Sequence, residues 1–206
     1  MTTTLFTNAH IATGEPGSTA ASTLPLQDIL VTDGVFTAFG PGLAQQYEAQ
    51  GGDPAAIEVV DLGGKLVCPP FCDTHLHLDY VFTARKPGAV NESGTLFEGI
   101  QRWSETKSDL TVDEIKQRAK IGIKKEMLHG VQLIRSHADV TDPNLTSLKA
   151  LLELKEELKD TVTLQIVSFP QEGMYSYEGP HGESGAELVE EGLKMGADCV
   201  GGIPHF

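Results

Sequence analysis

The chain has 206 residues, 40% of them hydrophobic and 21% charged, an ordinary globular composition with enough apolar residues for a sizeable core. Acidic residues outnumber basic ones by 29 to 15, for a formal net charge of -14, and no lysine- or arginine-rich stripe stands out. A nucleic-acid polymer is therefore not expected as a partner, whereas a small neutral substrate fits this balance. No apolar run reaches membrane-spanning length and the start lacks a signal-peptide pattern, so we expect no membrane partner.

Residues 1–66 are expected to form a small, mostly β module. Turn signals such as Asp33-Gly34 separate short runs of β-prone residues. These runs occupy residues 4–6, 28–31, 35–39 and 57–62. A polar stretch at residues 45–54 stands between the last two runs.

From Lys65 the pattern changes to strands that alternate with helices. The expected strands are residues 66–78, 131–140, 161–169 and 197–204, and they end near Leu78, Val140, Phe169 and Pro204. The expected helices are residues 96–105, 111–130, 144–160 and 184–196. Two of these helices begin with a capping box, Thr111 with Glu114 and Ser184 with Glu187.

This alternation predicts an α/β fold in which the strands lie parallel, in chain order, with the helices on one side. The repeat of roughly thirty residues is that of one βαβ unit, so residues 67–206 supply about four such units. A closed eight-stranded barrel of the TIM type needs about 250 residues. We therefore expect the first half of such a barrel, with the chain ending near its fourth strand.

Three cysteines, Cys68, Cys72 and Cys199, are too few and too irregularly spaced for a disulfide framework. They are expected to be reduced thiols of a cytoplasmic protein. Cys68 and Cys72 do not have the spacing of a zinc knuckle, and we expect both to lie in or beside a buried strand.

The segment from Asp73 to Asp79 contains two histidines with one leucine between them. Alternate side chains of a strand share a face, so His75 and His77 should point the same way at the end of the first strand, where barrel enzymes place their active sites. Two such imidazoles can bind one metal ion, zinc or iron by preference, with Leu76 turned into the packing. The alternative is a pair of core histidines that hydrogen-bond locally.

These residues resemble a known family. His75-Leu76-His77, after Pro69-Pro70-Phe71, is similar to the first metal motif of the metal-dependent amidohydrolase superfamily. Residues 93–100, 169–173 and 202–206 are similar to segments of its cytosine deaminase branch, in the same order and with similar spacing. The His-x-His motif marks only the superfamily, whereas Phe-Pro-Gln-Glu-Gly at residues 169–173 narrows the match to the branch.

The resemblance implies a hydrolytic deaminase of a cyclic amidine or pyrimidine such as cytosine, with one divalent metal ion, zinc or iron, as cofactor. It implies that His75 and His77 are metal ligands and that Gln171 binds the amide edge of the ring, for which a side-chain amide offers a donor and an acceptor. Phe169 and Leu96 match apolar pocket positions, although either could be core. Without the resemblance, Gln171 would be read as a solvated loop residue.

The resemblance also implies residues that later strands supply: a third histidine, an acid/base glutamate and a metal-binding aspartate. In the implied reaction, water activated by the metal attacks the ring carbon that bears the amino group, the glutamate moves the proton and ammonia leaves. The small β module should be a partial β-sandwich whose remaining strands come from the C-terminus. We therefore assign no catalytic residue within this chain and expect the chain alone not to deaminate cytosine at a useful rate.

Other assignments stay open. Asp79 either orients a metal-binding histidine or caps the following loop. His137 and His205 are expected to have structural hydrogen-bonding roles, and the remaining histidines, His10, His129 and His181, are expected at the surface or in loops. The alternative functions are hydrolysis of a related ring, creatinine-like or triazine, and a non-catalytic truncated fragment. A homo-oligomer is also left open.

Overall fold

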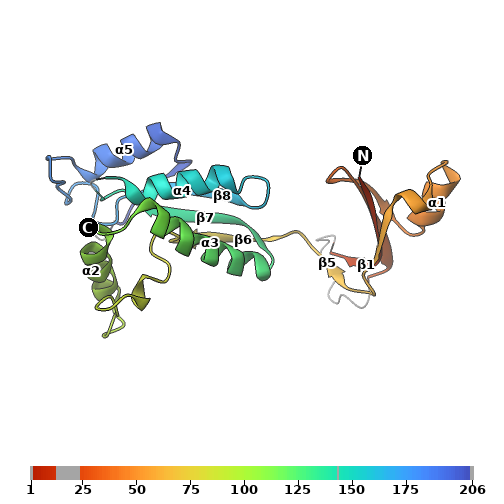
Figure 1. Ribbon diagram of the computed structural model, residues 1–206, viewed down its shortest axis with the longest axis horizontal. Coiled ribbons are helices and arrows are strands. Elements are labelled where there is room, and N and C mark those ends of the chain that lie inside the picture. The colour runs from red at the N-terminus through yellow and green to blue at the C-terminus, as the bar shows by residue number, and fades with distance from the viewer. Residues whose placement is uncertain (1, 13–23, 143, 205–206) are drawn as a thin grey trace. The chain divides into compact units, whose positions relative to one another are not determined.

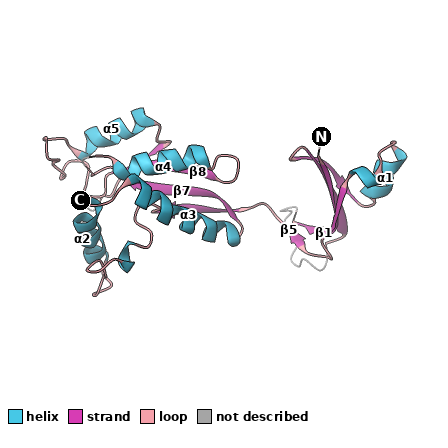
Figure 2. Cartoon of the chain, in the orientation of Figure 1, coloured by secondary structure: helices cyan, strands magenta, loops and turns pink. Residues whose placement is uncertain are grey.

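The computed structural model of the protein describes residues 2–12, 24–142 and 144–204 (Figure 1). The chain divides into two compact units, Met1–Pro69 and Pro70–Phe206. The first unit consists mainly of strands, and the second combines strands with helices (Figure 2). In the described part of the chain, no helix is long and apolar enough to cross a membrane.

A five-stranded mixed sheet forms the first unit, with β1 at its centre. Strand β1 pairs antiparallel with β2, which pairs antiparallel with β3, while β4 and β5 pair with β1 in parallel. The strand bounds are β1 Thr3–Ile11, β2 Leu26–Thr32, β3 Val35–Gly40, β4 Glu58–Asp61 and β5 Leu66–Val67. The β-prone runs of the sequence therefore become strands because alternate residues, such as Leu5, Ala9 and Ile29, are buried against the rest of the unit.

The polar stretch between β3 and β4 folds into a short helix, α1 (Leu43–Ala49), and a 3₁₀ turn, η2 (Pro54–Ala56). Sequence analysis did not predict this helix because its polar residues have no clear apolar period. Only Leu43 is buried in it, and the backbone N–H of Leu43 donates to Asp28 Oδ2 at 3.0 Å. The described residues of this unit form one sheet, and the second layer of a sandwich stays a prediction.

A four-stranded parallel sheet forms the second unit, in the order β6-β7-β8-β9. All three strand pairs are parallel, which confirms the predicted direction and order. The strand bounds are β6 Phe71–Leu76, β7 Val131–Asp139, β8 Thr163–Phe169 and β9 Cys199–Val200. Its closure into a half barrel stays a prediction.

Helices connect these strands, as βαβ units require. They are α2 Leu96–Lys107, α3 Val112–Leu128, α4 Thr146–Glu157 and α5 Gly185–Met195, with a 3₁₀ turn, η3, at Thr83–Arg85. The capping boxes predicted at Thr111 and Ser184 are both present, so the sequence located the starts of α3 and α5 correctly. Helix α5 ends at Gly196, whose φ of 117° suits a residue without a Cβ.

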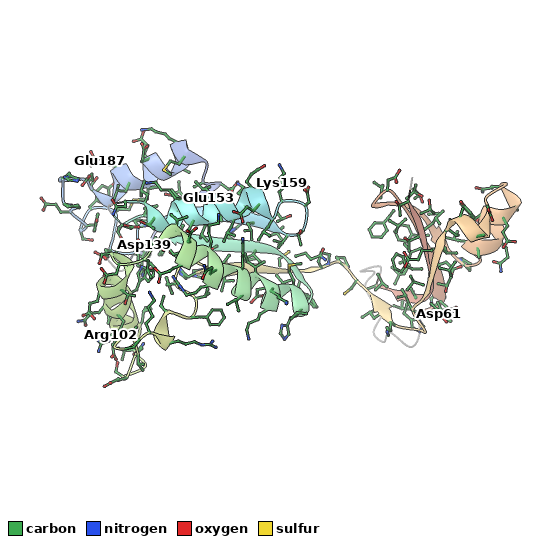
Figure 3. All side chains as sticks on the ribbon, viewed as in Figure 1. Asp61, Arg102, Asp139, Glu153, Lys159 and Glu187 are labelled. Atoms are coloured by element: carbon green, nitrogen blue, oxygen red, sulfur yellow. The ribbon has the colours of Figure 1, made fainter. Side chains whose placement is uncertain are left out.

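Helices α3, α4 and α5 pack against β7 and β8 and bury the core of the unit (Figures 1 and 3). Ile134 and Ile166 of the strands and Leu148 and Leu151 of α4 are fully buried in this core. Helix α2 instead lies where the parallel strands end, because its Trp103 and Lys107 bond with Asp139 at the end of β7. This end of the sheet is the one at which barrel enzymes place their sites.

Three details of the expected elements are wrong. The expected first strand, residues 66–78, is two strands, because Leu66–Val67 pairs with β1 of the first unit and only Phe71–Leu76 pairs with β7. The expected fourth strand is shortened to Cys199–Val200, although the backbone N–H of Gly201 still donates to Ser168 O of β8 at 2.9 Å. Cys68, between β5 and β6, and Cys72, on the edge strand β6 of the described sheet, are both exposed.

Candidate active site

A pocket of about 620 Å³ lies at the carboxyl ends of β6 and β8. Four segments form its walls: the end of β6, the loop and first turns of α2, the end of β8, and the residues after β9. The lining residues come from these segments and from Tyr80: His75, His77, Tyr80, Asn91, Gly94, Thr95, Leu96, Gly99, Ile100, Trp103, Phe169, Gln171, Gly202, Ile203 and Pro204. The wall is mostly apolar with a few polar groups, which is typical of small-molecule sites.

Strand β6 places His75 and His77 at this pocket, and their ring centroids lie 5.3 Å apart in an edge-on arrangement. His77 follows the last residue of the strand, and Leu76 between the two histidines packs against the core of the unit. His77 Nδ1 lies 3.1 Å from the backbone carbonyl oxygen of His137. Burial, together with the neighbouring rings of His137 and His75, lowers the pKa of His77 to about 4, so this imidazole is neutral at pH 7.

His137, near the end of β7, contacts both of these histidines. Its ring stacks on His75 with centroids 4.0 Å apart, and it meets Phe169 edge-on at 5.4 Å. Its carbonyl accepts the bond from His77, whereas its own Nδ1 is buried without a hydrogen-bond partner in the described structure. The structural role expected of His137 is therefore to contact His75 through its ring and His77 through its carbonyl oxygen.

The donor set fits part of a metal site. A neutral imidazole that donates through Nδ1 keeps the lone pair of Nε2 for a metal, and this arrangement is usual for zinc-binding histidines. His75 can supply a second imidazole beside it. Within residues 2–12, 24–142 and 144–204, no group of three or more His, Cys, Asp or Glu side chains is placed to hold one ion. Two ligands are fewer than the three or four of stable sites.

Gln171 lies just beyond the end of β8 and is 5% exposed. Its backbone N–H points to Asp139 Oδ1 at 3.4 Å, and its side-chain Oε1 is buried without a hydrogen-bond partner in the described structure. A buried acceptor of this kind costs roughly 1–3 kcal/mol unless something bonds to it. Two apolar residues expected at the pocket also line it, Phe169 at 6% exposure and Leu96 at the open rim at 68%.

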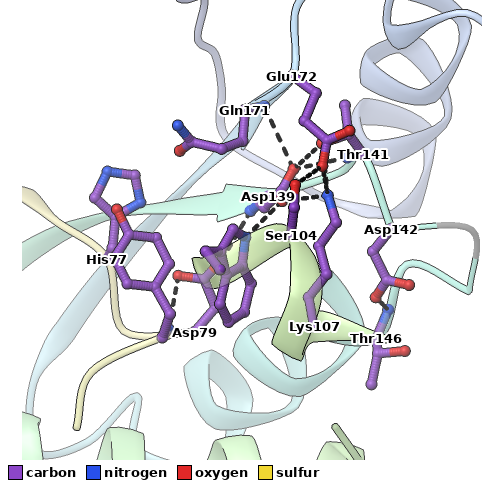
Figure 4. Close-up of polar contacts among 12 residues, drawn as sticks. His77, Asp79, Ser104, Lys107, Asp139, Thr141, Asp142, Thr146, Gln171 and Glu172 are labelled. Carbon is purple, nitrogen blue, oxygen red and sulfur yellow. Dashed lines mark hydrogen bonds and ion pairs between the residues drawn. The ribbon is translucent and has the colours of Figure 1, made fainter. Parts of the chain in front are cut away.

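Of the two roles left open for Asp79, the structure favours capping of the following loop over orientation of a histidine ring. Its carboxylate accepts the backbone N–H of Tyr80 at 3.1 Å and of Asp139 at 2.9 Å. It is fully buried, and burial raises its pKa to about 7. Asp79 therefore ties the segment after the histidine motif to the end of β7, as Figure 4 shows.

Sequence analysis missed two aromatic residues of the pocket, Tyr80 and Trp103. The ring of Tyr80 stacks on His77 with centroids 4.5 Å apart, and Trp103 packs beside Tyr80 at 4.8 Å. A signal for Trp103 was available, because residues 96, 99, 100 and 103 recur at helical spacing and so share one face of α2. Tyr80 offered no comparable pattern, since it follows the strand in an irregular loop.

The other histidines lie apart from this pocket. His129 caps the end of α3 and His181 is exposed in a loop, as expected. His10 is on strand β1 and partly buried, which contradicts the expected surface or loop position. His205 lies outside the described residues.

The fold and pocket define a class: a parallel α/β scaffold with a His-x-His motif at the carboxyl end of its first parallel strand, β6. The profile of the amidohydrolase family matches residues 58–206. The chain is 35% identical to the N-isopropylammelide isopropyl amidohydrolase of Pseudomonas sp. (strain ADP) over 148 residues. This aligned region covers 70% of this chain and 36% of that protein. The chain therefore belongs to the amidohydrolase family.

Solved structures show the same likeness. The 5-methylcytosine deaminase of Klebsiella pneumoniae, liganded with 5-fluorocytosine, is 40% identical with a TM-score of 0.78, over 98% of this chain and 43% of that one. The N-isopropylammelide isopropylaminohydrolase of Burkholderia multivorans is 25% identical with a TM-score of 0.71, over 97% of this chain and 44% of that one. The chain thus spans less than half the length of these relatives.

Proposed function

We propose that this chain carries the N-terminal part of the active site of a metal-dependent deaminase that releases ammonia from a cytosine-like ring. The observation that carries the proposal is the buried, unpartnered Oε1 of Gln171, which lines the same pocket as His75 and His77. A side-chain amide that lines a pocket and has an unpartnered oxygen suits a ligand that donates a hydrogen bond. The likeness to a 5-methylcytosine deaminase supports a pyrimidine as that ligand.

The pocket's own residues suit a flat heterocycle. Gln171 offers one amide oxygen and one amide nitrogen, which complement a ring that presents a donor beside an acceptor. Phe169, Trp103 and Ile100 supply apolar surface against the ring. In this proposal the chain binds and orients the ring, and its apolar walls exclude water around it.

In this proposal His75 and His77 hold one divalent ion, zinc or iron. The bond from His77 to the carbonyl of His137 fixes the ring and its tautomer, so that Nε2 is ready to bind without losing a proton. The chemistry that such an ion supplies in hydrolysis is Lewis-acid activation of water. The acid/base carboxylate and the further metal ligands are not among the residues that line the described pocket.

A second candidate is the hydrolytic removal of an amine substituent from a triazine ring. It is favoured by the 35% identity to the N-isopropylammelide amidohydrolase, and Gln171 would suit the amide edge of that ring as well. The two candidates differ in what leaves the ring, ammonia from cytosine or isopropylamine from N-isopropylammelide. Product analysis therefore separates them.

The test joins residues 1–206 to the remaining C-terminal part of the Klebsiella pneumoniae enzyme, here called the fusion protein. The purified, metal-loaded fusion protein is incubated with cytosine, 5-methylcytosine or N-isopropylammelide. The released ammonia and isopropylamine are then measured. The proposal predicts ammonia release from a pyrimidine at a rate well above that from the triazine. Preferred release of isopropylamine would favour the second candidate. A folded fusion protein that turns over none of the three would contradict both.

A further inference from the structure

A buried network of charged and polar groups links two walls of the pocket (Figure 4). One wall is α2, whose Trp103 is 4% exposed, and the other is the segment after β8, whose Gln171 is 5% exposed. Neither residue bonds directly to the other in the described structure. The groups between them, Lys107, Asp139 and Glu172, do not line the pocket.

Lys107 is the last residue of α2 and is 7% exposed, although lysine is rarely buried unless it is paired. Its Nζ lies 3.0 Å from Asp139 Oδ2, 3.1 Å from Thr141 Oγ1 and 2.6 Å from Glu172 Oε1. The three N–H donors of an ammonium group therefore meet three acceptors. Ser104, one turn earlier on α2, also donates its hydroxyl to Glu172.

Asp139 connects this cluster to both walls. Its Oδ2 accepts the indole N–H of Trp103 at 2.7 Å as well as the bond from Lys107. Its Oδ1 accepts the backbone N–H and the hydroxyl of Thr141 and faces the backbone N–H of Gln171 at 3.4 Å. Both oxygens of this fully buried carboxylate are thus occupied, and their bonds reach α2, Thr141 after β7 and the segment after β8.

We propose that Lys107 and Glu172 are positioning residues, whose ion pair, together with the bond from Ser104 to Glu172, holds the side chains of Trp103 and Gln171 in a fixed relation across the pocket. Glu172 follows Gln171 directly in the chain, so its bonds to Ser104 and Lys107 tie the ring-binding segment to α2. The role deepens the proposed function and rests on it, since it concerns how the same pocket is shaped. Neither residue touches the pocket itself, so each acts only through its neighbours.

A second ion cluster in the same unit provides a matched comparison. Lys116 of α3 pairs with Glu153 and Glu157 of α4, so it joins two elements through one lysine and two acidic groups, as Lys107 does. It has no contact with the pocket. Loss of the Lys116 pairs should lower stability without changing the signals of Trp103 and Gln171, because a purely structural ion pair has no special link to that pocket.

The test uses nitrogen-15 NMR of the 206-residue chain, in which Trp103 is the one tryptophan and gives one indole N–H signal. Glu172→Gln and Ser104→Ala are compared with Lys116→Met. We expect both substitutions at the network to shift the Trp103 indole and Gln171 side-chain amide signals and to speed indole hydrogen exchange at least tenfold. Lys116→Met should leave all three unchanged.

Ser104→Ala removes only a hydroxyl, so it decides the matter if Glu172→Gln does not fold. Unchanged indole and Gln171 signals in the folded network variants would overturn the proposal. Changes of equal size in Lys116→Met would also overturn it, because they would reveal a general loss of stability. The NMR test uses no substrate, so its result does not depend on which ring the pocket binds. Failure of the proposed function would be detected only in the activity assay of the fusion protein.

Discussion

The Nδ1 atom of His77 lies 3.1 Å from the backbone carbonyl oxygen of His137, which joins the histidine motif to the neighbouring strand β7. A carbonyl oxygen can only accept, so His77 carries its proton on Nδ1. The bond therefore settles the tautomer of His77 and leaves Nε2 as the nitrogen with a free lone pair. A strand-end histidine held in this way is oriented for a ligand before any ligand arrives.

The first prediction concerns this tautomer. At pH 7.5, nitrogen-15 spectra of the histidine rings should show His77 as neutral with the proton on Nδ1, because a carbonyl fixes it and burial disfavours the charged form. His181, exposed in a loop, serves as the internal comparison and should show a mixture of tautomers. A proton on Nε2 of His77 would contradict the geometry of the motif.

The second prediction separates binding from stability at Gln171. Gln171→Leu removes a buried acceptor that lacks a partner, so the free energy of unfolding should stay the same or rise by about 1 kcal/mol. Affinity of the fusion protein for 5-fluorocytosine, followed by fluorine-19 NMR, should fall at least tenfold. The control is Gln165→Leu, within β8 and bonded to Arg135, which should lose no affinity. Equal affinity in both variants would remove Gln171 from the site.

The third prediction concerns the close packing of Gly201 against the pocket wall. A Cβ at this position would lie 2.7 Å from side-chain carbons of both Phe169 and Val167, whereas a Cβ on Gly202 would meet nothing within 4 Å. Gly201→Ala should therefore lower the free energy of unfolding by about 1–3 kcal/mol, the usual cost of overpacking. Gly202→Ala, measured in the same urea titration, should change it by less than about 0.5 kcal/mol. Equal effects would show that the segment after β9 is looser than described.

The fourth prediction concerns pH and the start of α2. Hydrogen bonds from the hydroxyl of Ser93 and from the backbone N–H groups of Ser93 and Glu92 lower the pKa of Glu98 to about 2, below its usual value of 4.5. A carboxylate with a lowered pKa in the folded state stabilises the fold above pH 4.5, and this stability is lost as the pH falls toward 2. The natural chain should therefore be more stable than Glu98→Gln above pH 4.5, and this difference in the free energy of unfolding should decrease as the pH falls from 4.5 toward 2.

Ser93→Ala provides the control for this prediction, because it removes one donor and should weaken the same pH dependence. A difference that stays constant from pH 6 to pH 2 would mean that Glu98 is not held by these donors. The single tryptophan, Trp103, lies on the same helix and can report unfolding by its fluorescence.

The sequence predicted the parallel part of the fold well because its signals are local. The capping boxes at Thr111 and Ser184 determine helix starts through bonds within four residues, and the alternation of strands and helices fixes direction. The split of residues 66–78 could not be predicted in the same way. Leu66 pairs with β1, more than fifty residues earlier, and only tertiary contact decides such a pairing.

The residues of the pocket that could be predicted from the sequence are those at the ends of strands. His75, His77 and Gln171 stand at such ends, and the structure brings all three to one pocket. The network behind them could not be predicted, because the contact between Lys107 and Glu172 joins residues 65 positions apart. In the sequence, Lys107 lies beyond the predicted helix of residues 96–105, and no pattern indicates that it is buried.

The most direct test of the account compares ammonia release from cytosine by three metal-loaded proteins: the 206-residue chain, the fusion protein and its His77→Ala variant. In the proposed function, residues 1–206 supply two metal ligands and a ring-binding glutamine, whereas the acid/base carboxylate, whose loss typically costs about 10²–10⁴-fold, comes from the C-terminal part of the fusion protein. The proposed function predicts turnover by the fusion protein alone, with neither the chain nor the His77→Ala variant active. Clear turnover by the 206-residue chain, or a fusion protein that works equally well without His77, would contradict it.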